Sequence, residues 1–467
     1  MEPFFTNDAS VLGLLIIVLA VIFVTSSSTN TGWKKFYTYV PALLLCYFIP
    51  ALLHYPLGLI ASKWFSNDLV NLLDAQQIEV SLETLKGMTY DEIVVFLEEQ
   101  GLTKKTYGAY IGKSQLYFVA SRYLLPASLV LLCLGIDFKG IMNLGSKAII
   151  MFLAATLGIV LGGPIALMLV LYIAPELISA NASADEIWRG LSTVAGSWIG
   201  GGANQTAMKE IFEVQDRIFA SMIVVDVVVA NIWMGFLLYG ANMSDKLDRR
   251  LKADNSAIED LKQRIEHYRS QVSKIPTTTE VFVMLAVAFG GVALAHWGAD
   301  VIVPIMKGFK STLEALRLNS LMSGFFWLIV IVTTIGLAIS FTRFRKLEGI
   351  GASRWGSVFI YILVATIGMK MNLGDVVNNL GLFAVGIIWM LVHVSVLLLT
   401  AYLIKAPFFF VAVGSQANVG GAASAPIVAS AFSPSLAPVG VLMAVLGYAL
   451  GTYGALICAL LMQAVAT

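Results

Sequence analysis

Apolar runs of about twenty residues, nearly free of charged side chains, recur along this chain of 467 residues. A helix of that length spans the hydrocarbon core of a bilayer. The pattern therefore predicts an all-α polytopic membrane protein with about ten full spans. We place them at residues 10–25, 36–60, 117–136, 147–173, 218–240, 279–303, 319–342, 356–372, 380–404 and 438–463.

Two glycine-rich stretches interrupt this pattern. Gly196–Ala207 has the sequence GSWIGGGANQTA, and Gly414–Pro426 has the sequence GSQANVGGAASAP. Both begin with Gly-Ser, contain Gly-Gly-Ala and precede an apolar span, so we interpret the chain as an internal duplication. Glycine-interrupted segments at corresponding places of two halves are typical of a transporter binding site.

The distribution of basic residues predicts the orientation of the chain. Lys34 and Lys35, the basic residues of 241–275 and those of 343–354 belong in the cytoplasm, whereas the loop 175–186 contains no Lys or Arg and belongs outside. A re-entrant hairpin at the first glycine stretch satisfies this orientation. It also leaves five crossings per half, as an inverted duplication requires, so that the first hairpin enters from outside and the second from the cytoplasm. A full crossing by a broken helix is the alternative.

The turns of the two hairpins supply the candidate substrate site. Backbone that leaves helical geometry inside a membrane must be packed in protein or line a wet cavity. Glycines permit the turn, and we expect Asn204 and Ser424 to be N-caps of new half-helices whose N-termini favour an anionic group. The candidate substrate-binding residues are Ser197, Gly201, Gly202, Asn204, Gln205, Thr206, Ser415, Gln416, Asn418, Gly420, Gly421 and Ser424.

A sodium ion suits the carbonyl groups that end the first arm of each hairpin. Asp226 lies in the middle of an apolar span, and an intramembrane carboxylate is by default a functional candidate. A buried structural carboxylate is the alternative for Asp226. Trp198 either lines the pocket or packs the hairpin. His393 is expected to be a structural group, with a role in a proton relay as the alternative. The candidate ion-binding residues are Asp226, Asn204, Thr206, Asn418 and Ser424.

Composition removes several other classes of function. Hydrophobic residues make up 58% of the chain and charged residues 13%, and the net charge of +1 argues against a nucleic-acid partner. The sequence contains no motif of a soluble enzyme and no Cys/His spacing for a transition metal. An enzyme is therefore not predicted, and sodium is the one suspected cofactor. Cys46, Cys133 and Cys458 lie in apolar spans and are expected to pack rather than to form disulfides.

Two segments are too polar to span a membrane. Residues 61–116 form an acidic insert, in which Thr89–Leu97 is predicted to be an amphipathic helix. Residues 241–275 form a charged cytoplasmic linker with heptad spacing of Leu251, Ile258, Ile265 and Val272; it is either a solvated helix or a helix that pairs across a dimer. The predicted domains are scaffold spans 1–60, the insert, transport half 117–240 with hairpin 187–216, the linker, scaffold spans 276–342 and transport half 356–467 with hairpin 406–432.

Through Gly196–Asn204 and Gly414–Pro426 the chain resembles the YjcL-like family of bacterial membrane proteins, whose function is unknown. That family is grouped with cation/proton antiporters and anion transporters, including sodium–glutamate symporters. The resemblance implies an inverted-repeat fold in the bacterial inner membrane, a homodimer through its scaffold, and elevator movement of the transport domain. Proton exchangers of that group often carry paired acids, whereas this chain has only Asp226, which favours sodium symport.

The sequence thus predicts a sodium-coupled symporter of a small organic anion or amino acid that works by alternating access in the lipid bilayer. A cation/proton antiporter that uses Asp226 is the first alternative. A membrane subunit that couples ion flow to the chemistry of a partner enzyme is the second.

Overall fold

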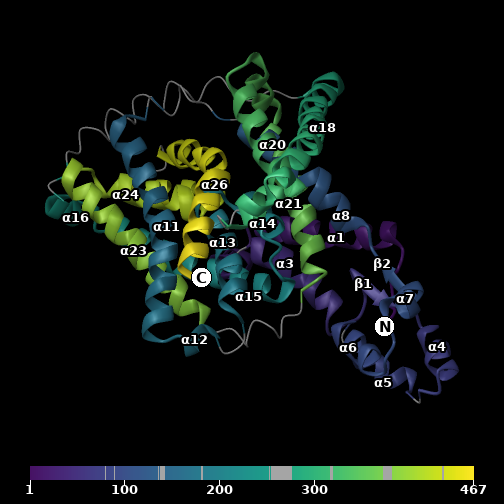
Figure 1. Cartoon of the computed structure of the whole chain (residues 1–467). Coiled ribbons are helices and arrows are strands. Elements are labelled where there is room, and N and C mark those ends of the chain that lie inside the picture. Colours follow the sequence, from purple (N-terminus) through teal and green to yellow (C-terminus); the bar gives the residue numbers. More distant parts are fainter. Residues whose placement is uncertain are drawn as a thin grey trace. The chain divides into compact units, whose positions relative to one another are not determined.

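The computed structural model describes residues 1–467 except 41, 79, 89, 135, 137–141, 143, 180–181, 252, 254–275, 316–318, 372–380, 434–435 and 467. The described chain is almost wholly helical (Figure 1). It divides into two compact units: Met1–Arg122 with Tyr361–Leu373, and Tyr123–Ile360 with Gly374–Thr467.

Six helices of the described chain are long and apolar enough to cross a membrane, or up to eight spans if each of two bent pairs counts as one. Each of the six agrees with a predicted span, so the protein is a multi-pass membrane protein, although the predicted number of ten spans is not confirmed. The six are α1 (Asp8–Ser26), Leu116–Leu134 (α8 Leu116–Val119, η2 Ala120–Leu124 and α9 Leu125–Leu134), α11 (Ser146–Ile173), α15 (Asp216–Ala241), α18 (Thr278–Gly308) and α23 (Leu382–Ile404).

The predicted span 36–60 is the clearest departure. It is divided between α2 (Thr31–Tyr39) and the shorter apolar helix α3 (Ala42–His54). Val40 lies between them in an extended conformation, with φ −119° and ψ 97°. The sequence explains the break, because the residue that precedes a proline is pushed out of the helical region, and Val40 precedes Pro41.

The insert in the first unit is a small folded structure. Strands β1 (Lys63–Phe65) and β2 (Ile111–Lys113) pair antiparallel, with Trp64 opposite Gly112. The predicted amphipathic helix is present as α6 (Tyr90–Glu99), and its buried Ile93 and Leu97 join Phe65 in a separate apolar core. The other elements of the insert are α4 (Leu69–Ala75), α5 (Leu82–Lys86), α7 (Lys104–Tyr107) and η1 (Gly108–Tyr110).

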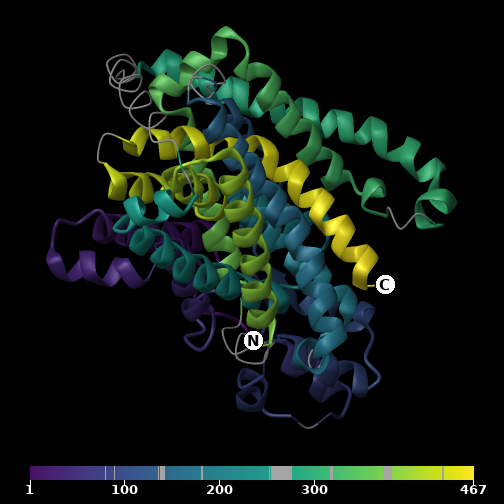
Figure 2. The same cartoon turned by 90° about the vertical axis from the view of Figure 1, so that its left-hand side faces the viewer.

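In the second unit, α18 lies beside α20 (Gly324–Ser340) in both views (Figure 1 and Figure 2), and both helices pack on α9. Helix α20 is bent by 96° into η4 (Arg343–Ile350), and α11 packs along α23. The remaining elements are α12 (Glu176–Ser179), α13 (Ala184–Gly200), α14 (Gly202–Ile211), α16 (Ser244–Leu251), α19 (Lys310–Ala315), η3 (Asn319–Met322), α24 (Phe408–Val419), α25 (Gly421–Phe432) and α26 (Ala437–Ala466).

Helix α21 (Ala352–Gly368) contains the boundary between the units at residues 360 and 361. The three cysteines are free and buried, as predicted. Of the heptad positions in the linker, only Leu251 belongs to the described residues, at the end of α16. The heptad prediction itself therefore lies outside the described residues.

Candidate functional site

The first glycine stretch folds back on itself. Helix α13 ends at Gly200, Gly201 adopts φ +75°, and α14 begins at Gly202. A Cβ atom built on Gly196 would lie 2.6 Å from the carbonyl oxygen of Asn204. Eight residues along an unbroken helix would separate these positions by about 12 Å. Helices α13 and α14 are therefore the two arms of a hairpin, which we call hairpin 1.

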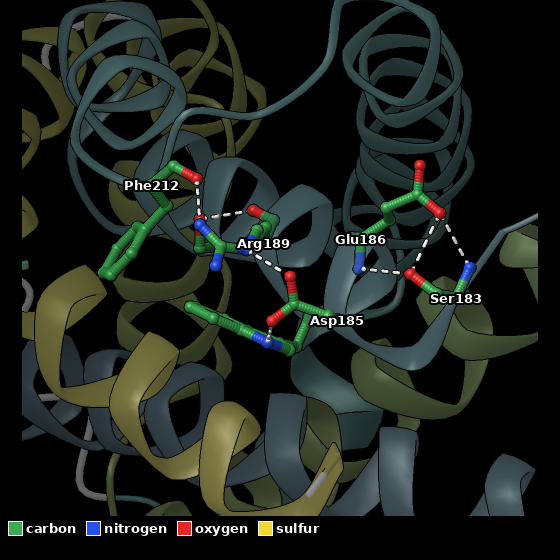
Figure 3. Close-up of polar contacts among 7 residues, drawn as sticks. Ser183, Asp185, Glu186, Arg189 and Phe212 are labelled. Atoms are coloured by element: carbon green, nitrogen blue, oxygen red, sulfur yellow. Dashed lines mark hydrogen bonds and ion pairs between the residues drawn. The ribbon is translucent and has the colours of Figure 1, made fainter. Parts of the chain in front are cut away.

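A polar network joins the two arms of hairpin 1 at the end opposite the glycine turn (Figure 3). Arg189 of α13 donates to the carbonyl oxygen of Phe212 at 2.9 Å, beyond the end of α14, and to the carboxylate of Asp185 at 2.7 Å. Ser183 and Glu186 form a capping box at the start of α13. The hydrogen bond from the backbone N–H of Ser183 lowers the pKa of Glu186 below its usual value. The N-terminus of α13 thus carries a stable negative charge, as a helix dipole favours.

The second glycine stretch folds in the same way and forms hairpin 2 from α24 and α25. The break falls at Gly420 and Gly421, and Gly421 adopts φ +58°. Phe408 and Phe432 lie equally far from Gly420 in sequence, and their ring centroids are 6.2 Å apart. Both stretches therefore fold back as the hairpin prediction requires, rather than running straight as a broken helix. Insertion of the hairpins into the bilayer stays a prediction.

The two hairpins meet at Gly447 of α26. A Cβ atom built there would lie 2.6 Å from the carbonyl oxygen of Ile199 and 3.7 Å from that of Ala417. These oxygens belong to the last turns of α13 and α24, where a helix leaves carbonyl groups without partners. Within the described residues, neither oxygen accepts a hydrogen bond outside its own helix. Two carbonyl groups from corresponding places in the duplication thus both lie close to Gly447 of α26.

Asp226 binds both arms of hairpin 1 to α15. It is 5% exposed, and its Oδ2 accepts from Ser197 Oγ at 2.6 Å and from Gln205 Nε2 at 2.9 Å. Its Oδ1 accepts from Trp198 Nε1 at 2.7 Å, and the Trp198 ring lies 5.1 Å from that of Trp389. All three donors are neutral. The structure therefore gives Asp226 an anchoring role, and a direct bond from its carboxylate to an ion stays a prediction.

The same face of α15 contacts hairpin 2 seven residues later, which is two helical turns. Trp233 Nε1 donates to Ser415 Oγ at 2.8 Å, and Ser415 Oγ lies 2.8 Å from His393 Nε2. His393 Nδ1 lies 3.0 Å from the carbonyl oxygen of Ala155. A carbonyl oxygen only accepts, so Nδ1 of His393 donates to Ala155, and in the neutral imidazole Nε2 then accepts from the hydroxyl of Ser415. His393 is a satisfied structural group, as expected.

The two predicted asparagines contact other helices of the second unit. Asn204 Oδ1 accepts from Thr452 Oγ1 of α26 at 2.6 Å. Asn418 Oδ1 accepts from Thr156 Oγ1 of α11 at 2.9 Å. Their oxygens are thus occupied, as is Thr206 Oγ1, which donates to carbonyl oxygens of its own helix. These contacts fix the position of each tip.

The predicted N-caps were wrong. Gly201 and Gly420 occupy those positions, because each new helix starts at the glycine that follows, Gly202 in α14 and Gly421 in α25. Asn204 instead lies inside the first turn of α14, where its side-chain N–H donates to the carbonyl oxygen of Gly200 at 3.0 Å. Ser424 lies within the first turn of α25 and accepts from Gln416 Nε2 at 2.6 Å.

Of the predicted residues, the structure brings Ser197 and Gln205 together on Asp226. It joins Gln416 to Ser424 at the second tip, where the buried Oε1 of Gln416 has no hydrogen-bond partner among the described residues. Gly202 is the first residue of α14. A Cβ atom built on it would lie near only one described side chain, the apolar Ile360, at 3.9 Å. The contacts of five further residues were not predicted from the sequence: Trp233, Thr452, Thr156, Gly447 and Gly451. Only Trp233 had a usable signal, its spacing of seven residues from Asp226.

Comparison with known proteins agrees with a membrane protein. The Uncharacterized membrane protein YjcL of Bacillus subtilis (strain 168) is 24% identical over 356 residues, which cover 73% of this chain and 82% of the relative. The family described as Protein of unknown function (DUF819) matches residues 97–465, far more than half of the chain and including both hairpins. The chain is therefore a multi-pass membrane protein that belongs to the DUF819 family.

Proposed function

We propose that the protein is a secondary active transporter of the bacterial inner membrane, a sodium-coupled symporter of a small organic anion or amino acid. The observation that carries the proposal is that two glycine-broken hairpins both approach Gly447, where, among the described residues, the carbonyl oxygens of Ile199 and Ala417 accept no backbone hydrogen bond from outside their own helices. Oxygen atoms from broken helices at the interface of two repeats are the usual ligands of a coupling ion.

The charge on Asp226 supports a cation at this place. Its carboxylate binds Ser197 and Trp198, the residues directly before Ile199, and the structure places no basic side chain against it among the described residues. A bound sodium ion would compensate this buried negative charge without displacing the three donors. The first turns of α14 and α25, which start at the same tips, offer backbone N–H groups to an anionic substrate.

Movement between inward- and outward-facing states would carry hairpin 1, hairpin 2 and α15 together, since Asp226 and Trp233 join α15 to both hairpins. The elevator mechanism and a homodimer remain part of the proposal. The insert of residues 61–116, with its own core, has no role in it.

A cation/proton antiporter is the second candidate. It is favoured by one observation: Asp226 is a buried carboxylate that only neutral donors contact. In that case the carboxylate itself would exchange a proton for a cation, and no organic substrate would exist.

Thermal unfolding of the purified protein in sodium, potassium and choline salts separates these candidates. A ligand that binds only the folded state at a hundred times its dissociation constant adds about 2.7 kcal/mol to the free energy of unfolding. We expect sodium alone to stabilise the wild type, and Gly447→Ala to abolish the effect because its Cβ would crowd the Ile199 carbonyl oxygen. Gly235→Ala is the matched control, because nothing lies within 4 Å of its Cβ position.

Each variant is compared with its own baseline in choline. A sodium shift of equal size in Gly447→Ala and wild type would remove the meeting point of the hairpins from the ion site. Absence of any sodium shift, together with a pH dependence of stability that disappears in Asp226→Asn, would favour the antiporter.

A further inference from the structure

The segment that follows α15 also contacts hairpin 2, at the end of the hairpin opposite its glycine turn. Helix α16 begins at Ser244, and its Asp248 is 7% exposed. Asp248 Oδ1 accepts from the backbone N–H of Phe408 at 2.7 Å, across 160 residues of sequence. Phe408 is the first residue of α24, and its N-cap residue is Pro407, which provides no side-chain cap. A carboxylate from α16 thus takes the place of the missing cap.

This contact is largely buried, since Asp248 and Phe408 are each 7% exposed. Phe408 is a core residue, and a Cβ atom built on Gly240 of α15 would lie 2.5 Å from its ring and 3.5 Å from Leu247 of α16. Little water therefore reaches this contact to replace the carboxylate as a partner of the Phe408 amide. A negative charge at this end also interacts favourably with the dipole of α24.

A lysine side chain contacts the other end of the turn 405–408, which connects α23 to α24. Lys147, in the first turn of α11, donates through Nζ to the carbonyl oxygen of Lys405 at 3.2 Å. Lys405 is the C-cap of α23 and adopts φ 52°. The turn 405–408, which leads from α23 into hairpin 2, thus has a positive side chain at the carbonyl end of one helix and a negative side chain at the amide end of the next.

We propose that Asp248 is a positioning residue of hairpin 2. It couples α16, at the start of the charged linker, to the tip of the hairpin, which carries Ser415, Gln416 and Asn418. Helix α24 is one continuous helix of twelve residues from this contact to the tip, so we infer that a shift of its first turn moves the tip with it. The inference rests on the proposed function only for what the tip binds, and the contact itself is independent of any ligand.

Hydrogen–deuterium exchange of the full-length protein without substrate tests this directly. In Asp248→Ala we expect amides of the first turn of α24 to exchange about 2- to 30-fold faster, the range that corresponds to a lost N-cap. The tip, residues 413–421, should also exchange at least about twofold faster, because its position depends on the arm. Asp248→Asn keeps an acceptor oxygen and should restore most of the protection.

Asp245→Ala is the matched control, since Asp245 lies on the same helix and is exposed. It should leave both regions unchanged, and residues 195–204 of hairpin 1 serve as an internal reference in every variant. If Asp248→Ala does not fold, Asp248→Ser, which is too short to reach the amide, replaces it. Wild-type exchange at the tip in the Ala or Ser variant would overturn the proposal, even where the first turn exchanges faster. Because no ion or substrate is added, this outcome is separate from failure of the proposed transport.

Discussion

Replacing Asp226 with alanine is expected to lower the free energy of unfolding by at least about 3 kcal/mol. The substitution leaves the buried donors of Ser197, Trp198 and Gln205 without an acceptor, and each unsatisfied group costs about 1–3 kcal/mol. Asp226→Asn should have a smaller effect, because one acceptor oxygen remains while the new NH₂ group faces a donor. Denaturant or detergent unfolding of the purified variants measures both values.

Asn231→Ala is the control for this prediction. Asn231 lies on the same helix, and its side chain donates to the carbonyl oxygen of Val227 in its own helix. We expect that variant to unfold close to wild type. Equal stability of Asp226→Ala and Asn231→Ala would show that Asp226 does not hold the two arms of hairpin 1.

Substitution of Gly451 by leucine is expected to cost about 3 kcal/mol or more. A Cβ atom at this position would lie 2.5 Å from the Cα atom of Gly200 and from Asn204 Nδ2, so α26 and hairpin 1 would have to separate. Overpacking of this kind costs about 1–3 kcal/mol, and the separation also breaks the hydrogen bond between Thr452 and Asn204. The same unfolding measurement applies.

Gly235→Leu provides the comparison, because its Cβ position is open and it lies in α15. Leucine should stabilise that helix by up to about 1 kcal/mol through its higher propensity. A Gly451→Leu variant as stable as Gly235→Leu would contradict the close approach of α26 and hairpin 1.

Much of the fold follows from local features of the sequence. The length of each apolar run located the six long helices, and the glycine clusters located both hairpin turns, since only glycine readily adopts the positive φ found at Gly201 and Gly421. The spacing of Ile93 and Leu97 located the amphipathic helix of the insert. These features depend on a residue and its near neighbours.

The contacts of the candidate site depended on tertiary packing and were less accessible. Thr452 and Thr156 look like ordinary small residues of apolar spans, yet they bind Asn204 and Asn418, more than 240 residues away. The role of Gly447 likewise appears only once α26 lies between the hairpins. The N-cap error came from placing the polar residues at the helix start, where the turn glycines lie.

Direct binding of radioactive sodium to the purified protein tests the central claim, that the two hairpin tips form one cation site. We predict saturable binding that potassium and choline do not displace, that persists in Gly235→Ala, and that is lost in Gly447→Ala although this variant remains folded. Absence of saturable sodium binding in the wild type, or undiminished binding in Gly447→Ala, would contradict it.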